Sequence, residues 1–263
     1  MEIIRIRLVN SLGKTKGCEE APVEVLKELK KIGSKENGEI IEFSKLNLEE
    51  IHVDLNDLEE ANHLIYKNSE EAFHKNDKVF FIGGDHNISY SIGKAFNKVE
   101  HKPLLIVFDA HADCIEAGKE PTHEEWLRKL IEGGFNPSNL ILISARNLWQ
   151  EEIEFLNEHK ITWIKMDLIR EDIHEICDLV MERAKDSSGF YISIDIDAVD
   201  PSCAPGASYL EPGGLSSNEL IYFVKRLKLI KNFRGADIVE INPSLDVNRM
   251  TVRLGARLLA EMM

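Results

Sequence analysis

The 263-residue sequence has few cysteines, no long apolar run and a deficit of positive charge. No apolar stretch reaches the length of a membrane-spanning helix. The 32 Lys and Arg residues against 46 Asp and Glu residues leave a net charge of −14, which argues against nucleic acid or an anionic membrane as the main partner. Residues 1–9 predict a strand and not a signal peptide. We therefore expect a cytoplasmic protein.

The cysteines are widely separated and contain no Cys-x-x-Cys pair, so neither a zinc ribbon nor a redox motif is expected. Cys114 and Cys203 fall in loops that also carry candidate site residues. We expect a packing role for both of them. The remaining two are Cys18 and Cys177.

Short apolar runs alternate with amphipathic segments along the whole chain, which predicts an α/β protein with one domain over residues 1–263. An open doubly wound sheet and an eightfold barrel both fit this alternation. The expected strands are 2–9, 39–43, 79–82, 104–108, 140–144, 161–164, 190–196 and 236–241. The expected helices are 21–31, 57–75, 88–97, 123–132, 149–159, 167–185, 217–228 and 246–263.

The segment Asp-Ala-His-Ala-Asp at 109–113 follows the apolar strand 104–108. Alternate side chains of an extended segment share a face, so Asp109, His111 and Asp113 can converge. Two carboxylates and an imidazole suit manganese, zinc or iron, and suit calcium less well. By itself the motif is only moderately specific, because a buried strand that ends in a capped polar loop also produces it.

Three other apolar strands end in residues that bind metals. His86 follows the strand at 79–82, Asp195 and Asp197 end the strand at 190–196, and Glu240 ends the strand at 236–241. Parallel sheets place their sites at the carboxyl ends of strands. Four such endings in one chain therefore predict a single metal centre.

The candidate ligands are more numerous than one catalytic ion needs, because such an ion keeps a position open for water. Six ligands with several carboxylates favour two ions about 3.5 Å apart, as in hydrolytic metal pairs. A structural metal is the alternative, although structural sites rarely gather so many oxygen ligands. The six residues are His86, Asp109, His111, Asp113, Asp195 and Asp197.

The motifs together resemble those of the arginase/agmatinase (ureohydrolase) family, and their order is kept over residues 80–246. The resemblance implies a three-layer α/β/α fold with an eight-stranded parallel sheet. It also implies two manganese ions per chain and hydrolysis of a guanidino or amidino group. The matching segments are Gly83-Gly84-Asp85-His86, Asp109-Ala-His-Ala-Asp113, Ser193-Ile-Asp-Ile-Asp197, Asp200-Pro201, Ala204-Pro205-Gly206, Glu211-Pro-Gly-Gly-Leu-Ser216 and Glu240-Ile-Asn-Pro243.

The resemblance assigns ligands to each ion. His86 and Asp113 are implied for one metal and His111 and Asp197 for the other. The two remaining carboxylates, Asp109 and Asp195, are implied to bridge or serve both.

Three residues are implied to act in catalysis. Asp113 holds the hydroxide and passes its proton to the leaving amine. Glu240 orients the guanidinium by a charge-assisted contact. His123, at the expected start of helix 123–132 with Thr122 as a candidate cap, shuttles protons.

The substrate tail is less certain, because the loop 114–121 matches no arginase or agmatinase loop. The acidic residues around the expected site favour a cationic tail, and therefore agmatine. Arginine, 4-guanidinobutyrate and formiminoglutamate remain alternatives, as do a non-catalytic metal-binding scaffold and a deacetylase-like hydrolase. The resemblance also implies a homo-oligomer, a trimer or hexamer. The charged residues considered for the tail are Glu116, Lys119, Glu120, Glu124, Glu125 and Glu211.

Overall fold

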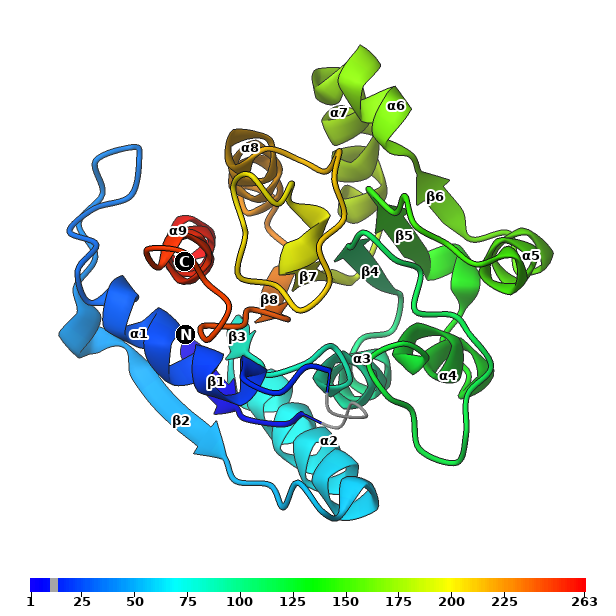
Figure 1. The fold of residues 1–263 in the computed structure, drawn as a ribbon, viewed down its shortest axis with the longest axis horizontal. Coiled ribbons are helices and arrows are strands. Elements are labelled where there is room, and N and C mark those ends of the chain that lie inside the picture. The colour runs from blue at the N-terminus through cyan, green and yellow to red at the C-terminus, as the bar shows by residue number, and fades with distance from the viewer. Residues whose placement is uncertain (10–13) are drawn as a thin grey trace.

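The computed structural model describes residues 1–9 and 14–263. Within these residues, eight parallel strands form one sheet in the order β2-β1-β3-β8-β7-β4-β5-β6. The edge strands β2 and β6 each pair on one side only, so the sheet is open and not a barrel (Figure 1). The strands are β1 (Glu2–Ile6), β2 (Asn47–Ile51), β3 (Val79–Ile82), β4 (Pro103–Phe108), β5 (Leu140–Ile143), β6 (Thr162–Ile164), β7 (Gly189–Asp195) and β8 (Phe233–Val239).

Helices cover both faces of the sheet and form the expected three-layer α/β/α fold. One face carries α1 (Ala21–Leu29), α6 (Met166–Glu171), α7 (Ile173–Lys185), α8 (Ser217–Leu227) and α9 (Met250–Met262). The other carries α2 (Leu58–Lys75), α3 (Ile88–Val99), α4 (Trp126–Glu132) and α5 (Gln150–Glu158). Short 3-10 helices occupy Cys18–Glu20, Phe43–Lys45, Pro137–Asn139 and Ile196–Ala198.

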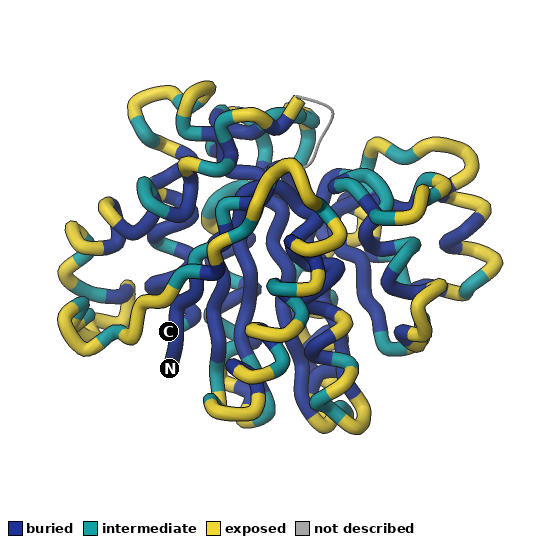
Figure 2. Tube along the Cα trace, turned by 90° about the horizontal axis from the view of Figure 1, so that it is seen from below, coloured by how far each residue is buried: buried dark blue, intermediate teal, exposed yellow. Residues whose placement is uncertain are grey.

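Strand β4 shows how the sequence builds two cores. Successive side chains of a strand point to opposite faces. Leu104, Ile106 and Phe108 accordingly join one core, whereas Leu105 and Val107 join the other. Because both faces of the strand are covered, its sequence is continuously apolar. Figure 2 shows the buried strands running through the middle of the molecule, with the exposed residues on the outer helices and loops.

The prediction of a second strand at 39–43 was wrong. Ile40 in that segment is 70% exposed and forms only an isolated bridge with Ser34. The strand is instead β2, whose sequence Asn-Leu-Glu-Glu-Ile has no apolar run. It lies at the edge of the sheet, where charged side chains are tolerated and discourage pairing with other chains. Pairing with β1, and not hydrophobicity, determines its position.

Three helices of the structure differ from their predicted ranges: one is broken in two, and two begin later than predicted. The expected helix 167–185 is broken at Asp172, whose backbone is extended. The Asp172 side chain caps α7 by accepting hydrogen bonds from the backbone N–H groups of His174 and Glu175. Helix α9 begins at Met250 and not at 246, because Asn248 and Arg249 have left-handed backbones. The helix expected at 123–132 begins at Trp126. In the described parts of the chain, we find no helix that could cross a membrane.

Candidate metal centre

The candidate site residues follow four adjacent strands in the middle of the sheet. Strands β3, β8, β7 and β4 are neighbours, and Ile82, Ile238, Ile194 and Phe108 align across their ends. The residues that follow these positions therefore emerge side by side at one edge. The strand order explains how segments separated by up to 154 positions, such as His86 and Glu240, come into contact.

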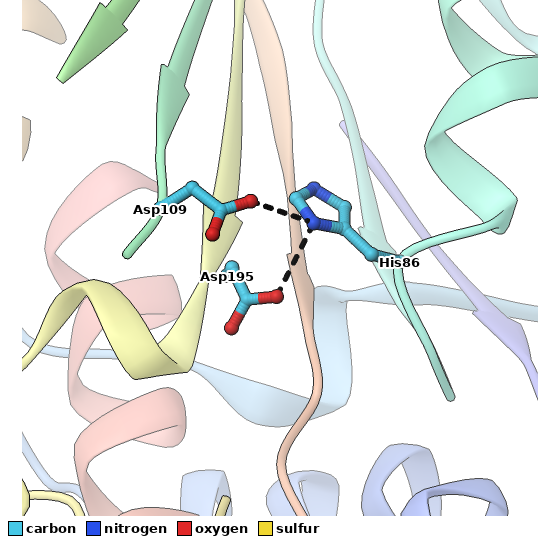
Figure 3. Close-up of side chains that lie close together, drawn as sticks. All are labelled: His86, Asp109 and Asp195. Atoms are coloured by element: carbon cyan, nitrogen blue, oxygen red, sulfur yellow. Dashed lines mark ion pairs between the residues drawn. The ribbon is translucent and has the colours of Figure 1, made fainter. Parts of the chain in front are cut away.

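The first group of candidate ligands surrounds the Nδ1 atom of His86. This nitrogen lies 3.1 Å from Oδ2 of Asp109, 3.1 Å from Oδ2 of Asp113 and 3.2 Å from Oδ2 of Asp195. Figure 3 shows Asp109 and Asp195 pointing toward the imidazole from two different strand ends. Nδ1 is buried and makes no hydrogen bond of good geometry with the described residues. A buried nitrogen among three carboxylates fits the first coordination shell of a divalent cation.

The second group surrounds His111. Its Nδ1 atom lies 3.0 Å from Oδ2 of Asp197 and 3.6 Å from Oδ1 of Asp109. Each group of three, His86 with Asp109 and Asp195 or His111 with Asp109 and Asp197, offers ligand atoms within 4.8 Å of one another. Asp109 belongs to both groups. The structure therefore brings all six predicted ligands together in an arrangement that fits two ions sharing one carboxylate.

The electrostatics of the centre also fit a bound cation. Burial raises the pKa of Asp195 well above its usual value, and the neighbouring carboxylate of Asp197 raises it further. Burial likewise raises the pKa of Asp113 to about 7, with a further contribution from Asp109. Burial opposes protonation of His86, yet the three carboxylates around it raise its pKa well above the ordinary range. Divalent cations would supply the positive charge that this cluster of carboxylates requires.

Asp113 is held in place by residues that no sequence motif identified. Its backbone is left-handed, with φ +52°. The indole Nε1 of Trp126 donates a 2.7 Å hydrogen bond to its Oδ2, and the Trp126 ring packs against His86. The carboxylate of Glu152 accepts hydrogen bonds from the backbone N–H groups of Cys114 and Trp149. These contacts anchor the loop that follows the Asp-x-His-x-Asp segment.

Glu240 lies beside the centre and not within either ligand group. It is buried, has a left-handed backbone with φ +62°, and its Oε1 accepts a 2.8 Å hydrogen bond from the backbone N–H of His86. Burial raises the pKa of its carboxyl well above the usual range, with a further contribution from Asp85. The side chain lines the same cavity as four of the six candidate ligands, His111, Asp113, Asp195 and Asp197.

His123 lies in a turn before α4, and not in the helix itself as the sequence predicted. Thr122 does not cap α4, which begins after Glu125. His123 is buried, and burial lowers its pKa to about 4, so its imidazole is neutral at neutral pH. Its Nε2 lies 3.4 Å from the hydroxyl of Tyr209, which donates to Glu124.

A cavity of about 180 Å³ opens over the centre. Four candidate ligands, Glu240 and His123 line it, and so does Ile115 from the loop 114–121. Asn147 and Trp149 belong to a segment that sequence reasoning did not connect with the site. Lys14 and Tyr209 also line it, and Lys14 lies over the Tyr209 ring. The lining residues are Lys14, His111, Asp113, Ile115, His123, Glu124, Asn147, Trp149, Glu152, Asp195, Asp197, Tyr209 and Glu240.

Most of the charged residues expected near a substrate tail are engaged elsewhere. Lys119 forms an ion pair with Glu59. Glu120 accepts a hydrogen bond from the side chain of Asn62, and Glu125 accepts one from the backbone N–H of Thr122. Glu211 approaches Nε2 of His111 to 3.7 Å without lining the cavity. Of the six residues named from the sequence, only Glu124 lines it. Cys114 is fully buried, in keeping with the packing role expected for it, and Cys203 lies in a different surface hollow.

Comparisons with known proteins agree with this geometry. The family model described as "Arginase family" matches residues 7–263. A formimidoylglutamase of Bacillus subtilis (strain 168) is 30% identical over 98% of this chain and 84% of its own length. An agmatinase of the same organism is 31% identical over 69% of this chain and 61% of its own length. The crystal structure of formimidoylglutamase from Bacillus subtilis subsp. subtilis str. 168 matches with a TM-score of 0.92 at 28% identity, covering 99% of this chain and 85% of that chain.

Proposed function

Because the chain belongs to the arginase family of hydrolases, we propose that it uses two manganese ions to cleave a guanidino or amidino group. The observation that carries the proposal is the meeting of two imidazoles and four carboxylates at one edge of the sheet, beside a cavity that Glu240 also lines. A structural metal needs neither the open cavity nor a further buried carboxylate beside it.

The proposed ligands follow the two groups around the imidazoles. His86 and Asp113 would hold the first ion, and His111 and Asp197 would hold the second. Asp109 belongs to both groups and would serve both ions. Asp195 lies beside His86, and the family resemblance assigns it to both ions as well. When bound, such a pair activates water for attack near neutral pH.

The remaining residues orient the substrate and move protons. The Glu240 carboxylate binds the planar guanidinium through charge-assisted hydrogen bonds and presents its carbon to the centre. Asp113 holds the attacking water and transfers its proton to the leaving amine. His123, which is neutral at neutral pH, accepts a proton from the cavity and returns it to solvent.

Agmatine is the first candidate substrate. Its tail ends in an amine, which requires acceptors and no carboxylate-binding residues. Glu124 lines the cavity and offers such an acceptor, although Lys14 lies 3.8 Å from its Oε1. The agmatinase of Bacillus subtilis is also among the relatives of this chain.

N-formimidoylglutamate is the second candidate, and a separate observation favours it. Lys14 and Asn147 line the cavity and offer donors to a tail carboxylate. The relative that matches 98% of the chain is a formimidoylglutamase. Arginine and 4-guanidinobutyrate carry the same guanidino group as agmatine, and they complete the set of substrates to be tested.

The test measures kcat/KM for agmatine, arginine, 4-guanidinobutyrate and N-formimidoylglutamate, with manganese supplied and metal content determined in parallel. A guanidino substrate releases urea, whereas a formimidoyl substrate releases formamide, so the product identifies the reacting group. A preference for agmatine supports the first candidate, and a preference for a tail carboxylate overturns it. Bound metal without turnover of any of the four would favour the non-catalytic scaffold.

We also propose that the chain works as a cytoplasmic homo-oligomer, a trimer or hexamer, as the family resemblance implies. Light scattering at micromolar concentration is the measurement that checks the assembly. A monomeric mass would refute it.

A further inference from the structure

The two ring nitrogens of His86 face different surroundings. Nδ1 points into the group of carboxylates, whereas Nε2 lies 3.0 Å from the hydroxyl oxygen of Ser193 on β7. Both residues are fully buried. The Ser193 hydroxyl therefore governs the side of the imidazole that faces away from the proposed metal.

Ser193 in turn contacts a buried carboxylate on the next strand. Its Oγ donates a 2.7 Å hydrogen bond to Oδ1 of Asp237, which is the residue directly opposite it in the β7–β8 pairing. Asp237 is fully buried, does not line the cavity and belongs to neither ligand group. No Lys or Arg in the described parts of the chain forms an ion pair with it. Burying a carboxylate without an ion pair lowers the stability of the fold, so we expect a function that accounts for its position.

The direction of these hydrogen bonds follows from their chemistry. A serine hydroxyl has one hydrogen to donate, and an ionised carboxylate can only accept. When Ser193 donates to Asp237, its lone pairs are left to accept from Nε2–H of His86. The neutral imidazole then carries its hydrogen on Nε2 and presents the Nδ1 lone pair to the carboxylate-lined site. The opposite direction would place the hydrogen on Nδ1 and prevent this nitrogen from binding a metal.

We propose that Ser193 and Asp237 are positioning residues that hold His86 in the tautomer and orientation required for metal binding. The inference rests on the proposed metal centre and adds two residues that act on the metal through His86. Groups that hydrogen-bond a metal-binding histidine in this way typically contribute 10–100-fold to metal affinity.

The test measures Mn²⁺ binding by titration calorimetry to the full chain and to three variants. Ser193→Ala removes the acceptor for Nε2–H, and we expect 10–100-fold weaker binding. Asp237→Asn keeps the side-chain size but replaces a carboxylate, which can only accept, with an amide that can also donate to Ser193. The direction of the hydrogen-bond chain is then no longer fixed, and we expect weaker binding. Ser91→Ala is the matched control, because it also removes one buried hydroxyl, whose hydrogen bond goes to Asn62 and not to His86. Its affinity should stay within about twofold of wild type, since the groups that govern His86 are intact.

A second readout separates positioning from general damage to the fold. In the Zn²⁺-loaded protein, long-range ¹H–¹⁵N correlation spectra report which nitrogen of His86 carries hydrogen. We expect a protected Nε2–H in wild type and its loss of protection in Ser193→Ala. Hydrogen on Nδ1 in wild type, or wild-type affinity in both Ser193→Ala and Asp237→Asn, overturns the inference and leaves the proposed function standing. Wild-type protein that binds no divalent metal overturns both.

Discussion

The indole nitrogen of Trp126 donates a hydrogen bond to the carboxylate of Asp113 over 2.7 Å. Both side chains are buried, and the Trp126 ring also packs against His86 at a centroid distance of 4.6 Å. A single residue at the start of α4 thus contacts one carboxylate and one imidazole of the proposed centre. The contact provides a direct test of how far catalysis depends on the position of Asp113.

Trp126→Phe should lower turnover about 10-fold or more while both ions remain bound. The phenyl ring keeps most of the packing against His86, but the hydrogen bond to Asp113 is lost, and bonds to charged groups contribute about 1.5–3 kcal/mol. Steady-state kinetics and metal analysis measure the two effects. Trp163→Phe is the matched control, because its indole donates to the backbone oxygen of Ala145 and not to a candidate ligand. Equal losses in both variants would contradict the role given to Trp126.

Asp109→Ala should lose both ions, because its carboxylate belongs to both ligand groups. We expect wild type to contain two manganese ions per chain and the variant to contain few or none. Elemental analysis after dialysis gives the ratio. Asp167→Ala removes an exposed carboxylate from α6 and should leave the metal content unchanged. Wild-type protein with one tightly bound zinc ion would refute the two-manganese centre.

His123→Ala should reduce kcat by 10²–10⁴-fold, the usual contribution of a general acid–base group. Its metal content should equal that of wild type, since His123 belongs to neither ligand group. His159→Ala, on the far end of α5, serves as the control and should retain full activity. Stoichiometric loss of metal from His123→Ala would show that His123 is a ligand and not a shuttle.

Glu28→Gln should destabilise the fold without affecting the centre. The buried Glu28 accepts a local hydrogen bond from Lys31. It also accepts from Arg249 and Arg253, and these two bonds join α1 to α9. Loss of these charge-assisted bonds should lower the free energy of unfolding by about 2 kcal/mol at pH 7. Urea unfolding measures the change, and Glu71→Gln, in a pair with Lys75 in which both side chains are exposed, should cost much less.

The same variant has an expected pH dependence. The hydrogen bond from Lys31 is the main cause that lowers the pKa of Glu28 from 4.5 to about 2. A carboxyl whose pKa is lower in the folded state stabilises the fold above its unfolded pKa and loses that effect as the pH falls. The stability difference between wild type and Glu28→Gln should therefore shrink as the pH falls below about 4.5. A difference that stays constant down to pH 3 would contradict the assignment.

The candidate ligands could be predicted from the sequence because each follows directly from local pattern. An apolar run predicts a buried parallel strand, and the polar residues after it must lie at the carboxyl edge of the sheet. Asp109, His111 and Asp113 share one strand end, and the other candidates end neighbouring strands. The other residues that line the cavity could not be predicted this way, because Lys14, Asn147 and Tyr209 lie in loops without a chemical motif.

The sequence by itself determined which residue types stand at the ends of the strands, since periodicity and composition are local properties of the chain. Only the tertiary structure decided which of these ends are neighbours, because strand order depends on crossovers that no local pattern encodes. The pairing of Ser193 with Asp237 and the edge position of the charged strand β2 both follow from that order. Their partners are far apart in sequence, and their energies arise only when the sheet and its helices are packed.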